Sequence, residues 1–359
     1  MKKNNTLILG YGLSPNRTEA ISKSAIKLHN VHRKIGVSCD IVSIDQIVGT
    51  ESLVSCIVNH RKIKERLIQL ISNNHYTHIV DVFALPISSL LFTKPILTKF
   101  PGIVFFKEIQ NDYGSSRHIT YETLIRIIGN NKLIFDYVRK AANICFSRNL
   151  NLCNKYSLHY LPTSIPTKPL MERSYKSTLS VCYLGHPLAK KGISIFPEIF
   201  KDSRLGNNSI KYSFAFSDIG PRDDVIKEFI VAAEENNIKI NIEGKVDPSN
   251  FFRKNDIYLL PIHDQFGAAS TPNTVLEAME AGCVVMTTPI ESVQGVLNNQ
   301  NSILLKTIDA STIHEALITY QKNKKSLLNK SKISRSVIIN KYSESNYILL
   351  LRKLYETKK

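Results

Sequence analysis

The chain has 359 residues, of which 43% are hydrophobic and 21% are charged, a composition typical of globular proteins and not of disordered ones. Its length favours two domains over one. The formal net charge is +17, and an excess of this size attracts polyanions such as nucleic acid, an anionic membrane face or phosphorylated substrates. A lysine-rich bias of the proteome would give the same excess, so charge alone identifies no partner.

Apolar runs and cysteines indicate the compartment. The sequence lacks a stretch of about 18 uncharged apolar residues, which speaks against a transmembrane helix, and the N-terminal apolar run is too short for a signal peptide. The six cysteines are scattered without a Cys-x-x-Cys pair. This spacing favours a reducing compartment and speaks against structural zinc, so we expect a cytoplasmic protein.

In the first half of the chain, short apolar runs alternate with helix-length amphipathic segments, the pattern of βαβ units and parallel sheets. A glycine-containing loop at 10–16 follows the first strand, and Gly36 ends the first helix. The predicted strands are 6–9, 37–44, 79–83, 103–106, 144–147 and 158–161. The predicted helices are 18–34 and a basic helix over 52–72.

Three prolines within 162–169 indicate an extended connector, after which a second βα series begins. Its predicted strands are 179–184, 212–216, 238–242, 257–260, 284–287 and 303–305. Its predicted helices are 192–200, 224–236, 274–281, 311–322 and 332–355. We therefore predict an α/β protein with domains over 1–165 and 166–340, and a C-terminal helix within 341–359 for which a return to the first domain is considered. Ligands are expected in a central cleft, at the carboxyl ends of the two sheets.

Residues 273–288 form the most informative segment, Asn-Thr-Val-Leu-Glu-Ala-Met-Glu-Ala-Gly-Cys-Val-Val-Met-Thr-Thr. A loop of small and polar residues leads into a helix that begins near Asn273 or Thr274, and the free N–H groups of such a helix suit a diphosphate. Glu277 lies one turn further on, where its carboxylate can accept hydrogen bonds from ribose hydroxyls. The alternative is a solvent-facing glutamate on a capped helix.

A second segment, 183–192, places Gly185 at the end of a buried strand and Lys191-Gly192 six residues later. Glycine lets the backbone approach a ligand, and lysine supplies a positive charge for phosphate. An ordinary surface loop is the alternative.

Both segments resemble the donor-binding motifs of retaining GT-B enzymes, notably glycosyltransferase family 4. Residues 276–287 are similar to the family's Glu-Ala-Met-Ala helix, glycine and Val-Val strand, and 183–192 to its Gly-Arg-Leu-x-x-x-Lys-Gly loop. Two positions depart from the pattern. Ala269 stands where the family has the first of two glutamates, and His186 stands in place of an arginine, whose bidentate grip a histidine cannot reproduce.

Weaker matches extend the resemblance over nearly the whole chain. Gly12 lies in the loop that faces the donor in the family, and Gly244 and Lys245 lie in the element whose loop cradles the base. The family's first domain carries a strand that ends in His-Asp near the sugar. Glu108 is the candidate for that place and His118 the second choice, and for either the alternative is an ordinary loop residue.

The resemblance implies a GT-B fold of two Rossmann-like domains and a hexosyltransferase that moves a sugar from a UDP- or GDP-linked donor to a glycan or lipid-linked acceptor in surface polysaccharide or glycoconjugate synthesis. Retention at the anomeric carbon is implied. No metal or other cofactor is expected, because a lysine and a helix dipole can replace the charge of a cation. The catalytic candidates are Lys191 and Glu108. The donor-binding candidates are Gly12, Gly185, His186, Lys191, Gly244, Lys245, Asn273, Thr274 and Glu277.

Other functions were weighed against this one. Ala269 and His186 leave open a non-catalytic relative that binds a sugar nucleotide or a partner enzyme. A nucleic-acid-binding protein is disfavoured, because no RNA- or DNA-binding module is recognisable. Peripheral contact with an anionic membrane is a further possibility, since the basic helix 52–72 also has an apolar face. In the alternative for this helix, the apolar residues pack on the sheet and the charges are solvated.

Overall fold

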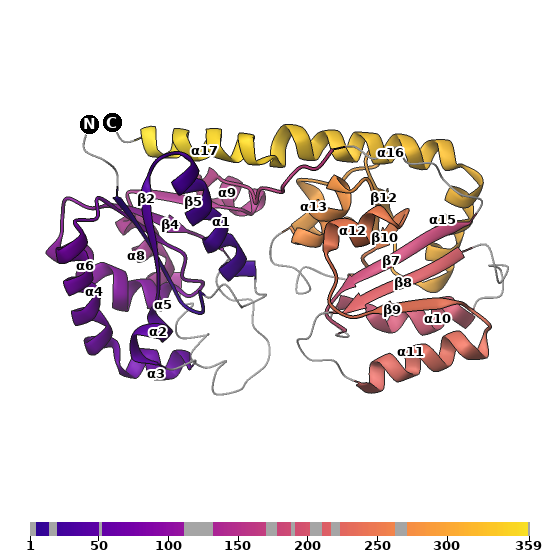
Figure 1. The fold of residues 1–359 in the computed structure, drawn as a ribbon, viewed down its shortest axis with the longest axis horizontal. Helices are drawn as coiled ribbons and strands as arrows, with labels where there is room; N and C mark the ends of the chain where they lie inside the picture. The colour runs from indigo at the N-terminus through magenta and orange to yellow at the C-terminus, as the bar shows by residue number, and fades with distance from the viewer. Residues whose placement is uncertain are drawn as a thin grey trace. The chain divides into compact units, whose positions relative to one another are not determined.

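The computed structural model describes residues 5–13, 20–49, 52–110, 132–169, 178–187, 191–201, 210–216, 223–262 and 271–357, without the side chains of 20, 21 and 223–225. It divides into two compact units (Figure 1). Unit 1 contains Met1–Pro162 and Ile348–Lys359, and unit 2 contains Thr163–Tyr347. Each unit has one six-stranded sheet whose strand pairs are all parallel. The predicted α/β class with two Rossmann-like domains is confirmed.

The sheet of unit 1 has the strand order β2-β1-β3-β4-β5-β6. Its strands are β1 (Asn5–Gly10), β2 (Ser38–Ser43), β3 (His78–Asp81), β4 (Val104–Glu108), β5 (Ile144–Ser147) and β6 (His159–Tyr160). In β1, Leu7, Ile8 and Leu9 are all fully buried. A continuous apolar run of this kind is what a parallel strand needs when helices cover both faces of the sheet. All six strands coincide with predicted segments, with small shifts at their ends.

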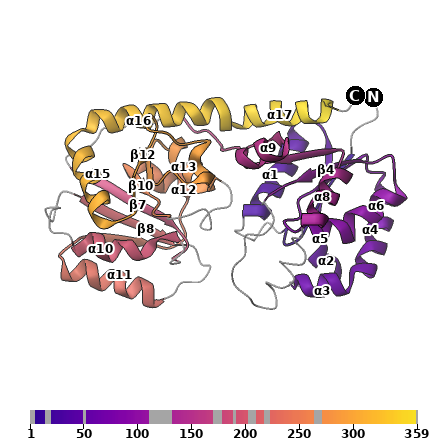
Figure 2. The same cartoon turned by 180° about the vertical axis from the view of Figure 1, so that it is seen from behind.

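Helices flank this sheet, as Figure 2 also shows from behind. They are α1 (Ala20–Lys34), α2 (Ile44–Val48), α3 (Leu53–Val58), α4 (His60–Asn74), α5 (Pro86–Ser88), α6 (Lys94–Lys99), α8 (Lys132–Ala141) and α9 (Leu150–Tyr156), with a π-helical turn at Ser89–Thr93. The prediction of one helix over 52–72 was wrong, because α3 ends and α4 begins at Asn59. At this break the Asn59 side-chain amide donates to the Ser55 carbonyl (2.8 Å), which also accepts from the Asn59 backbone N–H (3.0 Å).

The apolar face of α4 is turned into the protein. Ile63, Leu67 and Ile71 are buried and belong to the same core cluster as Leu7 and Ile79 of the sheet. The apolar residues of this basic helix therefore pack on the sheet. No helix in the described ranges is long and apolar enough to cross a membrane.

The sheet of unit 2 has the order β12-β11-β10-β7-β8-β9. Its strands are β7 (Leu179–Gly185), β8 (Ile210–Phe216), β9 (Ile240–Glu243), β10 (Ile257–Leu259), β11 (Val284–Thr287) and β12 (Ile303–Leu304). The helices are α10 (Phe196–Lys201), α11 (Asp223–Glu235), α12 (Pro248–Arg253), α13 (Asn273–Glu280), α14 (Glu291–Gln294), α15 (Ala310–Lys322) and α16 (Lys324–Val337). In Figure 1, α10 and α11 lie on one face of the sheet and α12 and α13 on the other.

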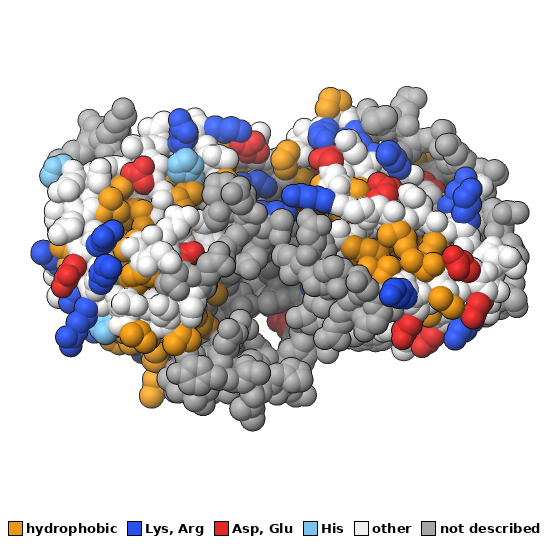
Figure 3. Space-filling view, turned by 60° about the horizontal axis from the view of Figure 1, so that its bottom comes forward, with side chains coloured by type: hydrophobic (Ala, Val, Ile, Leu, Met, Phe, Trp, Pro, Cys, Tyr) orange, Lys and Arg blue, Asp and Glu red, His pale blue; other side chains and the backbone are white. Residues whose placement is uncertain are grey.

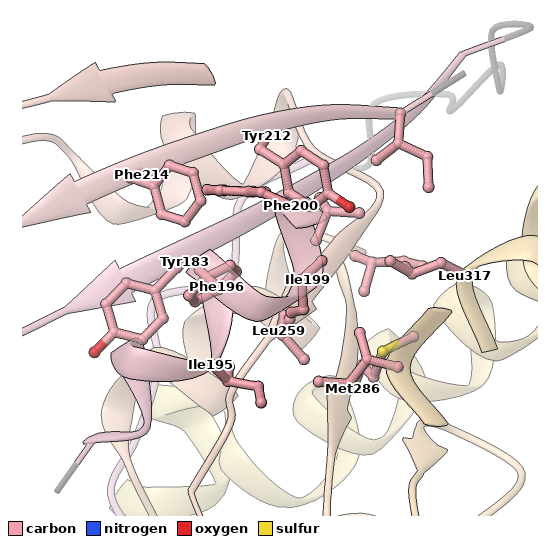
Figure 4. Close-up of a cluster of buried hydrophobic side chains, with 14 of the residues drawn as sticks. Tyr183, Ile195, Phe196, Ile199, Phe200, Tyr212, Phe214, Leu259, Met286 and Leu317 are labelled. Carbon is pink, nitrogen blue, oxygen red and sulfur yellow. The ribbon is translucent and has the colours of Figure 1, made fainter. Parts of the chain in front are cut away.

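Each face of this sheet has its own core. One cluster contains Tyr183 of β7 and Leu259 of β10, with aromatic rings from α10 and β8 packed edge to face around Phe196 (Figure 4). The other cluster contains Cys182 of β7 and Tyr258 of β10, packed against α12 and α13. Neighbouring residues of a strand alternate between faces, so Tyr183 and Tyr258 lie on opposite sides of the sheet.

The stretch 332–355, predicted to be helical, is helical apart from one residue, but it is not one continuous α-helix. A π-helical turn at Ile338–Tyr342 and extended Ser343 separate α16 from α17 (Glu344–Glu356). At this break the Ile165 N–H donates to the Tyr342 carbonyl (2.7 Å), and Ile165 pairs with Ser343 in an isolated parallel bridge. The last part of α17 belongs to unit 1. There the Tyr355 hydroxyl lies 2.6 Å from His32 Nε2 and 3.2 Å from Thr6 Oγ1.

Candidate functional site

The carboxyl edge of the unit 2 sheet brings most of the predicted donor-binding residues together. Open α/β sheets bind ligands at this edge because loops and helix N-termini converge there. Strand β7 ends at Gly185, and Pro261 follows β10 closely. Helix α13 begins at Asn273 and leads into β11.

The turn at Lys191 and Gly192 is packed directly against the end of β10. Gly192 has a φ of +77°, and a Cβ atom placed on it would lie 1.6 Å from the Pro261 carbonyl oxygen. Only glycine therefore fits at this position, for reasons of both space and backbone conformation. The contact fixes half-buried Lys191 beside the carboxyl end of β10.

A buried tyrosine connects β7 with the first turn of α13. The Tyr258 hydroxyl lies 3.1 Å from the Leu184 carbonyl oxygen and 3.0 Å from Thr274 Oγ1. The single proton of the Tyr258 hydroxyl thus has two acceptors within reach, the Leu184 carbonyl and the Thr274 hydroxyl oxygen. Burial raises the pKa of Tyr258 well above its ordinary value, so its proton stays available for this bond; the negative charge of Glu277 raises this pKa further.

Helix α13 packs one face against the core, and the side chains of its other face are half-buried. Val275, Leu276, Ala278 and Met279 are buried. Asn273, Thr274 and Glu277 are half-buried and share the remaining surface. The N-cap position is Pro272, which makes no side-chain capping bond. The first N–H groups of α13 therefore donate no hydrogen bond to an N-cap side chain, and an anion could accept from them instead.

Two of the predicted residues lie away from this group. Gly244 and Lys245 are exposed and follow β9, the outermost strand, which is separated from β7 by β8. A Cβ atom on Gly244 would meet nothing within 4 Å, so no described neighbour requires a glycine there. The structure thus gathers Gly185, His186, Lys191, Asn273, Thr274 and Glu277, and leaves Gly244 and Lys245 at the far edge of the sheet. Ala269 lies outside the described residues.

In unit 1, Gly12 forms the turn after β1. Its φ is +68°, and its N–H donates to Asp45 Oδ1 (3.0 Å), while the Leu13 N–H donates to Ser43 Oγ (2.8 Å). Asp45 is 8% exposed, so its carboxylate serves this turn from a largely buried position. The loop is therefore held in shape by residues at the end of β2 and the start of α2.

Glu108, the catalytic candidate of unit 1, is paired with an arginine. Arg148 Nε donates to Glu108 Oε1 over 2.6 Å, and the two side chains are 14% and 5% exposed. The preceding residue, Lys107, is in a second buried ion pair, with Asp81 (2.7 Å), and also donates to the Phe83 carbonyl. Two consecutive charged residues on one strand are thus each neutralised by a separate partner. His118 lies outside the described residues.

Several residues that organise these sites were not identified from the sequence. In the sequence, the charged residues Asp81, Lys107 and Arg148 can be recognised only by their position in or next to buried strands. Glu280 occupies a family alanine position in α13, and it is buried against Arg335 (3.1 Å) while accepting from the Lys168 N–H (2.8 Å). Glu280 therefore holds the proline-rich segment 162–169 in place through Lys168. It is not one of the predicted donor-binding residues.

Part of the chain is similar in sequence to a known family, and nearly the whole chain is similar in structure to known proteins. The model of the family "Glycosyl transferases group 1" matches residues 178–323, which include every predicted donor-binding residue of unit 2. A sequence search of curated proteins finds no match. Among solved structures, sucrose-phosphate synthase from Thermosynechococcus elongatus is similar over 99% of both chains, with a TM-score of 0.76 and 11% identity.

Two further structures are similar at comparable identity. HepE from Anabaena, in complex with UDP, has a TM-score of 0.72 and 8% identity over 98% of this chain and 100% of its own. TarM from S. aureus, in complex with fondaparinux, alpha-GlcNAc-glycerol and UDP, has a TM-score of 0.61 and 14% identity over 83% of this chain and 59% of its own. At these identities the similarity is one of fold, and the predicted GT-B architecture is confirmed.

Proposed function

We propose that the chain is a glycosyltransferase that moves a sugar from a nucleotide-sugar donor to a glycan or lipid-linked acceptor in surface polysaccharide or glycoconjugate synthesis. The match of residues 178–323 to the glycosyl transferases group 1 family, within a GT-B fold, supports this proposal. One observation carries the donor half of this proposal. The Lys191–Gly192 turn is packed on the end of β10, in the same edge of the sheet as the N-terminus of α13 and Glu277. A cation, a helix N-terminus and a carboxylate are the groups that a nucleoside diphosphate requires.

The donor would be held as follows. The N–H groups of the first turn of α13 and the Lys191 ammonium would bind the diphosphate, whose negative charge grows as the glycosidic bond breaks. Stabilising that charge lowers the barrier without a metal ion. Glu277 would accept hydrogen bonds from the ribose hydroxyls. Since the Thr274 hydroxyl is bonded to Tyr258, we assign Thr274 a role through its backbone N–H.

UDP is the first candidate among nucleotides and GDP the second. The HepE and TarM structures, both similar in fold, contain UDP. We assign the acceptor to unit 1, with Glu108, oriented by Arg148, as its catalytic candidate. Retention of configuration is part of the proposal, on the resemblance of 273–288 to retaining enzymes.

We further propose cytoplasmic action at the surface of an anionic membrane. The apolar residues Ile63, Leu67 and Ile71 of α4 are buried, so the helix can offer a membrane only its charged side. Such a contact is electrostatic, with no insertion of apolar side chains, and is therefore sensitive to salt.

A thermal-shift screen with UDP, GDP, ADP and CMP tests the proposal. A nucleotide at about 100 times its dissociation constant stabilises the unit that binds it by about 2.7 kcal/mol. Glu277→Ala should weaken that nucleotide by about 1.5–3 kcal/mol, the range for a hydrogen bond to a charged group. Glu315→Ala, a change at an exposed glutamate of α15, is the matched control and should leave binding unchanged. Unchanged affinity in folded Glu277→Ala would refute the assignment.

A non-catalytic sugar-nucleotide-binding protein is the second candidate, because Ala269 replaces a glutamate that contacts the donor sugar in the family. Nucleotide binding without measurable transfer or hydrolysis of any sugar nucleotide would favour it. Nucleic acid is not proposed as a ligand. On the face seen in Figure 3, the lysine and arginine side chains of the described residues are dispersed over each unit.

A further inference from the structure

The carbonyl groups on either side of Gly185 are both held by buried tyrosine hydroxyls. The Tyr258 hydroxyl donates to the Leu184 carbonyl over 3.1 Å, and the Tyr183 hydroxyl donates to the His186 carbonyl over 2.8 Å. Both tyrosines are among the largest fully buried side chains. Their hydroxyls are the polar ends of rings that otherwise belong to the two apolar cores.

The two hydroxyls reach this turn from opposite faces of the sheet. Tyr183 belongs to the cluster of α10 and β8, and Figure 4 shows its oxygen directed away from the neighbouring rings. Tyr258 belongs to the cluster of α12 and α13. Rotation of either peptide group would break one of these two hydrogen bonds, and the loss of a hydrogen bond to a buried hydroxyl destabilises a protein.

Space around Gly185 adds a further restriction. A Cβ atom at this position would lie 3.0 Å from the Tyr183 hydroxyl oxygen, closer than an ordinary van der Waals contact. After His186, buried Pro187 fixes the next φ angle and has no N–H of its own to rearrange. The backbone of residues 184–187 is therefore restrained by two hydrogen bonds, a close contact at Gly185 and a proline ring.

The same hydroxyl of Tyr258 also fixes α13. It lies 3.0 Å from Thr274 Oγ1 in the first turn of the helix, so one tyrosine hydroxyl joins the end of β7 to the N-terminus of α13. These are the two elements that would contact the donor diphosphate from different sides. Their spacing is therefore set by Tyr258, because sub-ångström placement of binding groups depends on the residues that support them.

We propose that Tyr183 and Tyr258 are positioning residues for the donor, which lock the Gly185–His186 turn and its distance from α13 in the form that binds a nucleoside diphosphate. The proposal rests on the proposed function. It assigns to each hydroxyl an effect on ligand affinity in addition to its effect on stability. A merely structural hydroxyl would affect stability alone.

The test compares Tyr258→Phe and Tyr183→Phe with Tyr76→Phe. Tyr76 is the matched control, since it is a buried tyrosine of unit 1 whose hydroxyl donates to Asp40 Oδ2 (2.5 Å). The unfolding midpoint of each variant is measured first, and the affinities for UDP and for uridine are then measured by calorimetry at a temperature where every variant is folded. Wild type and Glu277→Ala are measured alongside.

All three phenylalanine variants are expected to lose stability, and only the two in unit 2 to lose affinity for UDP. The expected loss is about three- to tenfold, the equivalent of one hydrogen bond. It should be larger for Tyr258→Phe, whose hydroxyl has two partners, and smaller for uridine than for UDP, because the locked turn faces the phosphates. If Tyr258→Phe does not fold, Tyr183→Phe carries the comparison.

Two outcomes separate the failure of this proposal from that of the proposed function. Affinity for UDP within twofold of wild type in the folded tyrosine variants, together with a clear loss in Glu277→Ala, would overturn the positioning role and leave the donor site intact. A wild-type protein that binds none of UDP, GDP, ADP and CMP would overturn the proposed function itself, and the positioning role with it.

Discussion

The contact of Gly192 with Pro261 gives the sharpest stability prediction. Replacing Gly192 by alanine forces an L side chain into a φ of +77° and places its Cβ 1.6 Å from a backbone carbonyl oxygen, which cannot rotate away as a side chain would. The left-handed conformation costs about 1–2 kcal/mol. Relief of the overlap by movement of the turn adds about 1–3 kcal/mol. The expected total for Gly192→Ala is therefore about 2–5 kcal/mol.

Gly36→Ala isolates the first of these costs. Gly36 has a φ of +78°, but a Cβ atom there would meet nothing within 4 Å. Its substitution should cost only the conformational part, about 1–2 kcal/mol. In a domain of this size 1 kcal/mol lowers the melting temperature by roughly 2–4 °C, so Gly192→Ala should lower the melting temperature of unit 2 by roughly 4–20 °C.

Scanning calorimetry of the two variants, with and without nucleotide, measures both effects. Because the turn carries Lys191, its movement in Gly192→Ala should also weaken binding of a nucleoside diphosphate more than binding of its nucleoside. Gly36→Ala should bind both as wild type does. Equal losses of stability in the two variants, or unchanged diphosphate affinity in a destabilised Gly192→Ala, would refute the reasoning from the Pro261 contact.

Three further predictions concern charge. Lys191→Ala should lower turnover more than it weakens donor binding, since the ammonium stabilises charge that develops in the transition state; Lys190→Ala should have little effect, and equal effects would contradict the motif register. Burial lowers the pKa of His32 to about 4. Between about pH 6.5 and pH 4 this imidazole is therefore protonated in the unfolded chain and neutral in the folded protein. Stability should fall by about 3 kcal/mol as the pH drops through that window, with a shallower slope in His32→Gln measured by urea unfolding. Co-sedimentation should show salt-sensitive binding to anionic but not neutral vesicles, weakened by charge reversal on α4; protein that stays in the supernatant at low salt would contradict the membrane proposal. The residues to reverse are Arg61, Lys62, Lys64 and Arg66.

Strands were predicted better than helix ends because buried parallel strands leave a local signal. Residues 144–147 and 284–287 were predicted as strands and are β5 and β11 with the same limits. A short apolar run of this kind fits the interior of a parallel sheet and little else. The helix breaks at Asn59 and 338–343 have no such signal, since the amphipathic period continues across both. The second break coincides with a hydrogen bond from Ile165, which is far away in the sequence.

In the proposed donor site too, features that depend on local sequence could be predicted, and features that depend on distant contacts could not. A glycine at the end of a strand, a lysine with glycine and a glutamate one turn into a helix are local patterns, so Gly185, Lys191 and Glu277 could be proposed from the sequence. What holds them at fixed distances is not local. Tyr258 reaches Leu184 across 74 residues and Thr274 across 16, and in the sequence it is only an aromatic residue within a buried strand. A phenylalanine would satisfy that apolar pattern equally well. The hydroxyl that distinguishes tyrosine from phenylalanine has its partners on other elements, and this is why a single-atom substitution is the experiment that tests whether the fold positions the donor.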